Sequence, residues 1–249
     1  MVLKQSRAGF TLIELMIVIA IIAVIAAIAI PGLLASQRAS NERNASASLK
    51  TITAAEADFR GNDRDGNKVQ DFWVQDLAQL YALDPMGSSE PIKLIDISIA
   101  GADTITAAVT PPGTPSSCTG ISNYITPGAK AGYWFRPLVN DEAGNAYGQP
   151  STVLAANVPV GALAASSWNT MKFGFMAFPD TRTQGKTVFI VNENNTIFKR
   201  GVNSTYNPAK TGAGMPQNTE PATAELVGPS PSLNYPTDAN LKADYSKLD

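Results

Sequence analysis

A single apolar segment near the N-terminus constrains the fold more than any other feature of the sequence. Residues 10–30 form an apolar run in which only Thr11 and Glu14 are polar. At about 1.5 Å per residue, a helix of this length extends roughly 31 Å, which matches the hydrocarbon core of a bilayer. The run therefore predicts a membrane-spanning helix that carries one acidic side chain near its start.

The residues before this run indicate its orientation. Residues 1–9 contain Lys4 and Arg7 and no acidic residue, and positive charge before a span holds that end in the cytoplasm. An ordinary secretory signal places its small-residue cleavage site after a shorter apolar region, whereas Ala8 and Gly9 precede this one. Cleavage after Gly9 would remove the basic leader, residues 1–9, and leave the helix on an exported chain.

A family resemblance begins at residues 9–14, which read Gly-Phe-Thr-Leu-Ile-Glu. This stretch resembles the class III signal of type IV pilins and type II secretion pseudopilins. The resemblance implies that a prepilin peptidase cuts between Gly9 and Phe10 and methylates the new amine of Phe10. It also implies that Glu14 is the family's glutamate, at the fifth mature position, and that Pro31 is the proline found late in the same helix.

Glu14 needs a cationic partner, because a carboxylate at membrane depth is costly. Cleavage of the leader supplies the amine of Phe10, which lies four residues before Glu14 and therefore on the same helix face. The pair could form within one chain. In the family that the signal resembles, the glutamate instead meets the amine of a neighbouring subunit and sets the axial register of a filament. The sequence alone leaves both pairings open.

Pro31 raises the question of where this helix ends. Pro31 has no N–H for the carbonyl of Ala27, and Gly32 follows it, so the pair predicts a bend or a loosened turn. A helix end at the membrane surface is the alternative interpretation. Small residues dominate residues 35–48, which would let neighbouring helices approach closely.

A second apolar pattern favours continuation of the helix. Leu49, Ile52, Glu56 and Phe59 recur with helical spacing in an otherwise polar segment, and Gly61 would end it. We therefore predict one helix over residues 11–60. Its residues 10–31 are the transmembrane and polymerisation segment, and residues 32–61 are half-buried against a head domain.

The head, residues 62–206, reads mainly as β-structure. Residues 72–81 predict a short second helix, and strand-like runs occur at residues 92–99, 104–109, 133–139, 172–178, 186–191 and 196–200. Pro137 favours an edge or terminal position for its strand. The polar residues 192–195 predict the clearest hairpin. Residues 207–249, rich in Pro, Thr, Asn, Ala and Gly, predict a loop-like or disordered tail.

These elements predict an α+β fold in which one long N-terminal helix packs on a C-terminal antiparallel β-sheet. The pilin resemblance implies the same pilin-like arrangement.

A polar loop after the helix suggests calcium. Asp63, Asp65, Asn67 and Asp71 occupy offsets 1, 3, 5 and 9, as oxygen ligands do in calcium loops. The loop departs from an EF-hand because its glycine is at offset 4 and Val74 stands at offset 12. An Asx-rich turn explains the same residues, so both interpretations stay open, and no other cofactor is predicted.

The composition excludes several function classes. Histidine is absent and Cys118 is the only cysteine, so the commonest general base is missing and no intrachain disulfide or Cys-rich zinc site can form. The formal charge of −2 gives no indication of nucleic-acid binding. No catalytic motif is present, and the sequence predicts no enzyme.

The predicted function is that of a structural filament subunit. The chain would sit in the inner membrane with its N-terminus cytoplasmic and its head periplasmic, and assemble with other pilin-like subunits into a type IV pilus or a secretion pseudopilus. Adhesive pilins commonly carry a C-terminal disulfide loop, which a single cysteine forbids, so the secretion branch is favoured. The alternative is a membrane-anchored extracytoplasmic binding module that does not polymerise.

Overall fold

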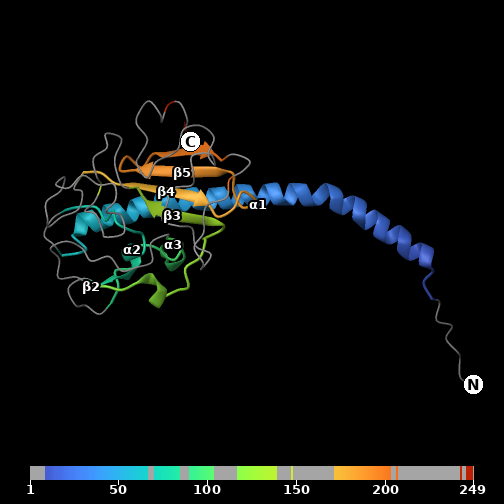
Figure 1. The fold of residues 1–249 in the computed structure, drawn as a ribbon, viewed down its shortest axis with the longest axis horizontal. Coiled ribbons are helices and arrows are strands. Elements are labelled where there is room, and N and C mark those ends of the chain that lie inside the picture. Colours follow the sequence, from blue (N-terminus) through green and yellow to red (C-terminus); the bar gives the residue numbers. More distant parts are fainter. Residues whose placement is uncertain are drawn as a thin grey trace, which may run out of the picture.

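One long helix and a β-rich head make up the molecule (Figure 1). The structure, a computed structural model, describes residues 9–66, 70–84, 90–103, 117–138, 147, 171–202, 206, 242 and 245–248. Helix α1, Leu12–Asn62, has 51 residues and is about 75 Å long. Its first half projects from the head as a curved rod, and its second half lies against the sheet.

The ends of α1 are set by two capping residues. Thr11 is the N-cap, and its hydroxyl accepts from the backbone N–H of Glu14. The predicted helix over residues 11–60 is confirmed, but it does not end at Gly61. Asp63 takes the left-handed conformation at φ 46° and donates its N–H to the carbonyl of Phe59, a conformation that aspartate tolerates better than most residues.

The head is built on a five-stranded antiparallel sheet with the order β3-β4-β5-β6-β7. Its strands are β3 (Tyr133–Pro137), β4 (Gly174–Pro179), β5 (Thr187–Asn192), β6 (Ile197–Gly201) and β7 (Ser246–Lys247). The strands predicted at residues 133–139, 172–178, 186–191 and 196–200 are confirmed. The strand with Pro137 lies at an edge of the sheet, where its missing N–H interrupts no ladder. The predicted hairpin is also confirmed, with Val191 opposite Ile197.

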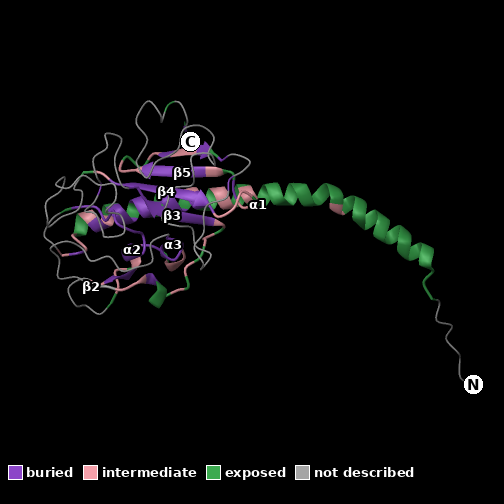
Figure 2. Cartoon of the chain, in the orientation of Figure 1, coloured by how far each residue is buried: buried purple, intermediate pink, exposed green. Residues whose placement is uncertain are grey.

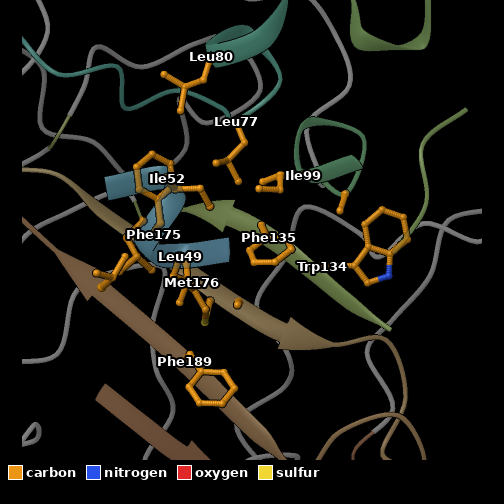
Figure 3. Close-up of a cluster of buried hydrophobic side chains, with 14 of the residues drawn as sticks. Leu49, Ile52, Leu77, Leu80, Ile99, Trp134, Phe135, Phe175, Met176 and Phe189 are labelled. Carbon is orange, nitrogen blue, oxygen red and sulfur yellow. The ribbon is translucent and has the colours of Figure 1, made fainter. Parts of the chain in front are cut away.

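The core forms where the second half of α1 meets the sheet. Leu49, Ile52 and Phe59 are fully buried, which confirms the helical stripe. Figure 3 places Leu49 and Ile52 of α1 beside Phe175 and Met176 of β4. In Figure 2 the same helix is exposed along its first half, whereas buried, intermediate and exposed residues alternate along its second half. The fold is therefore α+β and pilin-like, with one helix laid on one face of a sheet.

A loop between β4 and β5 ties the head to α1 just beyond the exposed half. Arg38 Nε donates to the carbonyl of Thr183 at 3.1 Å, and Asn41 Nδ2 donates to the carbonyl of Gln184 at 2.9 Å. Lys186 N–H donates to Glu42 Oε1 at 2.9 Å. These three contacts fix the point along α1 at which the helix leaves the head.

The predicted second helix over residues 72–81 is wrong for most of its length. Helix α2 covers only Gln79–Ala82. Before it, backbone N–H groups donate to buried carboxylates: Trp73 N–H to Glu56 Oε2 at 2.9 Å, and Leu77 N–H to Asp103 Oδ2 at 2.6 Å. Because these acceptors come from elsewhere in the chain, the segment satisfies its donors without a helical ladder.

The predicted strand over residues 92–99 is wrong as well. Its last residues begin helix α3, Ile97–Ala100, because the N-cap side chain of Asp96 accepts from the backbone N–H of Ser98 at 2.7 Å. The strand predicted at residues 104–109 lies outside the described residues. The sequence reading missed a small antiparallel pair, β1 (Leu83–Asp84) with β2 (Ser117–Cys118), and the short 3-10 helix η1, Ile121–Asn123.

The end of the chain returns to the sheet. β7 pairs with β6, with Lys247 opposite Phe198, and the ring of Tyr245 lies 5.6 Å from the guanidinium carbon of Arg200. The prediction of a loop-like or disordered tail is therefore wrong for Ser246–Lys247, because the unpaired edge of β6 offers these residues hydrogen bonds. Apart from residues 242 and 245–248, residues 207–249 lie outside the described residues.

Candidate functional site: the exposed half of the long helix

The first half of α1 presents apolar side chains on every face. All its large apolar side chains from Phe10 to Leu34 are between 45% and 88% exposed, as Figure 2 shows. By length and composition, α1 is the one helix in the described part of the chain that is able to cross a membrane. So large an exposed apolar surface requires lipid or other copies of the helix around it.

The bond predicted for cleavage lies just outside the helix. Gly9 and Phe10 are non-helical and exposed, and they precede the N-cap Thr11. A Cβ built at Gly9 would have no atom within 4 Å, so the bond between these residues is open to a peptidase. Residues 1–8 of the predicted leader lie outside the described residues.

Glu14 takes part in a capping box that the sequence reading overlooked. Glu14 Oε2 accepts from the backbone N–H of Thr11 at 2.8 Å and from the Thr11 hydroxyl at 2.7 Å. The Thr11 hydroxyl in turn accepts from the backbone N–H of Glu14 at 3.3 Å. The spacing Thr-x-x-Glu is the sequence signature of this box. In this uncleaved chain the nitrogen of Phe10 is a peptide nitrogen, and Thr11 is the partner of Glu14.

Pro31 lies inside α1 and does not end it. Proline removes one hydrogen bond from the helical ladder, and the hydroxyl of Ser36 bonds to the carbonyl of Gly32 at 3.0 Å in the next turn. The exposed half of α1 is visibly curved (Figure 1). The interpretation of a continuous helix is therefore confirmed over that of a helix end.

The loop predicted to bind calcium is divided between turn and core. Asp63 caps α1, whereas Asp65 and Asp71 are buried, at 0% and 1% exposure. Asn67 lies outside the described residues. Within the described ranges, no three His, Cys, Asp or Glu side chains are grouped closely enough to hold a metal ion. Calcium binding here stays a prediction from the sequence.

A buried acidic cluster was missed by the sequence reading. Glu56, Asp76 and Asp103 are each 0% exposed. The carboxylates of Glu56 and Asp103 accept from backbone N–H groups of the segment before α2, and that of Asp76 accepts from the N–H of Gln79, the first residue of α2. Burial, the largest cause, raises the pKa of Glu56 well above its usual range, and the charges of Asp71 and Asp76 act in the same direction. The pKa of Asp76 is raised well above its usual range by burial and by Asp103.

Comparison with known proteins gives one match, at the N-terminus. Residues 4–30 match the family model described as the prokaryotic N-terminal methylation motif. This motif is the prepilin-type signal of type IV pilins and pseudopilins. No curated protein and no solved structure matches the chain.

Proposed function

We propose that the chain is a structural subunit of a filament of the type IV pilus or type II secretion class. A prepilin peptidase would cleave it between Gly9 and Phe10 and methylate the amine of Phe10, and α1 would then carry polymerisation. The observation that supports this most is the coincidence of the methylation motif at residues 4–30 with an exposed apolar half-helix on a folded head.

The start of α1 would supply both charged groups for assembly, the amine of Phe10 and the carboxylate of Glu14. Cleavage turns the Phe10 nitrogen into a cation next to Thr11, whose N–H already holds the Glu14 carboxylate at 2.8 Å. The cation and the carboxylate thus lie at the same end of the helix. When copies of α1 pack together, their apolar side chains bury one another, and the carboxylate of one copy can pair with the amine of its neighbour. Such a pair offsets the cost of burying either charge alone.

We further propose a single-pass arrangement in the inner membrane, with the leader in the cytoplasm and the head on the exported side. Lys4 and Arg7 favour that orientation. Between the two kinds of filament, the single Cys118 favours the secretion pseudopilus, since it excludes an intrachain disulfide loop.

We also propose, from the sequence pattern alone, that residues 63–71 bind calcium. Calcium titration tests this proposal through the melting temperature of the head, and an unchanged melting temperature would reject it.

Mass spectrometry of the membrane-extracted protein tests the processing step. We expect the mature chain to begin at Phe10 with one added methyl group on its amine. A Gly9→Leu variant should retain the leader, because the family's signal requires a small residue before the cut. A wild-type chain that keeps Met1 would contradict the proposal.

A Glu14→Ala variant tests the role of the carboxylate in assembly. We expect it to insert in the membrane and to be cleaved normally, but to yield few or no filaments. For detection, Ala20→Cys in a Cys118→Ser background places one cysteine in the span. After oxidation, the cysteine-bearing protein that keeps Glu14 should give a ladder of disulfide-linked multimers. The same protein with Glu14→Ala should remain almost entirely monomeric. A monomeric result in both backgrounds would favour the membrane-anchored binding module.

A further inference from the structure

A groove lies between α1 and the sheet just beyond the exposed half of the helix. Its volume is about 360 Å³. One wall is the α1 segment from Ala39 to Ser46, and the other comes from β5, β6 and β7. The side chains that decide its chemistry are Glu42, Arg43, Phe189, Lys199, Arg200 and Leu248.

The groove has an excess of positive charge. Neither Arg43 nor Lys199 lies within 4.0 Å of a carboxylate in the described part of the chain. Arg200 is buried, with its guanidinium against the ring of Tyr245. The one acid in the lining, Glu42, already accepts from Lys186 N–H at 2.9 Å. Arg43 and Lys199 are therefore two cations, on opposite walls, that are available to an anion.

The height of the groove indicates which anion it meets. Leu33 and Leu34 are the last large exposed apolar residues of α1, and Ala39 begins the groove five residues later. That spacing corresponds to about 7.5 Å along the helix. A headgroup layer is roughly 5–7 Å thick on each side of the hydrocarbon core. With residues up to Leu34 in the hydrocarbon core, Ala39 lies at the outer edge of the headgroup layer and Arg43 lies about 6 Å further from the membrane. Because helical side chains tilt toward the helix N-terminus, Arg43 leans back toward the lipid phosphates.

We propose that this groove binds the headgroup of an anionic phospholipid from the membrane that α1 crosses. Arg43 and Lys199 donate to the phosphate from the two walls, and Phe189 and Leu248 contact the apolar part of the glycerol backbone. The site holds the head against the membrane surface before the subunit leaves the bilayer. This inference rests on the proposed membrane anchoring, but not on polymerisation.

Native mass spectrometry of the full chain, extracted in detergent with equal amounts of phosphatidylglycerol and phosphatidylcholine, tests the site. Monomeric wild-type protein should retain the anionic lipid with a preference on the order of tenfold. The double variant Arg43→Gln, Lys199→Gln should retain both lipids about equally. The matched control Lys50→Gln, Lys93→Gln removes the same charge from exposed positions outside the groove and should behave as wild type. Lys4 and Arg7 are present in all three proteins and cancel in the comparison.

Several outcomes would overturn the proposal. Equal retention by wild type, or an unchanged preference in the groove variant, rejects the site. Displacement of the lipid by inorganic phosphate would identify a free anion as the ligand, and a preference seen only in dimers would identify a second copy. Thermal melting followed by tryptophan fluorescence shows whether the double variant is folded. If the double variant is unfolded, the single variant Arg43→Gln is used in its place. Flotation with neutral phosphatidylcholine vesicles separates the two proposals: a chain that does not float rejects the anchoring, whereas one that floats without lipid preference rejects only the groove.

Discussion

Replacing Leu49 by alanine is expected to lower the free energy of unfolding of the head by about 2–5 kcal/mol. Leu49 is 0% exposed and lies between α1 and the sheet (Figure 3), so its removal leaves a cavity that the packed strands cannot fill. Urea denaturation of the full chain in detergent, followed by the fluorescence of the buried Trp73 and Trp134, measures the change.

Leu33→Ala is the matched control, because it makes the same chemical change on the same helix. Leu33 is 68% exposed and contacts lipid or other copies in the proposed function, not the head. We expect the unfolding of the head to change by less than about 0.5 kcal/mol. Equal losses in the two variants would contradict the division of α1 into an exposed half and a half that belongs to the core.

This division of α1 could be predicted from the sequence because it depends only on local patterns of apolar residues. An apolar run and a stripe such as Leu49, Ile52 and Phe59 need no knowledge of the rest of the chain, and both were confirmed. The same holds for the hairpin from β5 to β6, whose two strands are joined by a short polar turn. In the candidate site, Gly9, Phe10 and Glu14 were identified through a contiguous motif. All three lie within the residues that the methylation motif matches, and their individual roles stay predictions.

The elements that the sequence patterns predicted wrongly, or did not predict, depend instead on partners that are distant in the sequence. The segment before α2 has helical spacing, yet Leu77 donates to Asp103, 26 residues away. The cations of the proposed lipid groove come from α1 and β6, and only packing brings Arg43 near Lys199. β7 is too short to have a pattern of its own and is a strand only because β6 offers an edge. The capping box of Thr11 with Glu14 is different: its signal was present and was overlooked.

Glu56 is the buried group with the clearest consequence for stability. It lies on the core face of α1 at 0% exposure, and its Oε2 accepts from Trp73 N–H at 2.9 Å. Its Oε1 is buried and has no hydrogen-bond partner among the described residues. Asp71 and Asp76 are the charged neighbours that act on it, and both disfavour a second negative charge. A protonated Glu56 is therefore the form that suits the folded head.

Replacing Glu56 by glutamine is expected to raise the free energy of unfolding at neutral pH, because the folded head then no longer contains a buried carboxyl group whose charged form burial disfavours. The pKa of Glu56 in the folded head is raised above the usual value of about 4.5. Its contribution to stability is thus complete below that pH and is lost as the pH rises through the folded pKa. Wild-type stability should fall as the pH is raised from about 4.5 into the alkaline range, whereas the glutamine variant keeps an acceptor for Trp73 N–H and has no proton to lose.

Urea denaturation of both proteins across this range measures the two slopes, and their difference isolates Glu56. A weaker fall should remain in the variant, because the pKa of Asp76 is also raised by burial. Asp58→Asn is the control on the same helix: its side chain is 39% exposed and ion-paired with Arg64 at 2.8 Å, and exposed pairs contribute little. Equal slopes in wild type and Glu56→Gln would mean that Glu56 is ionised in the folded head, with a counter-charge that overcomes its burial.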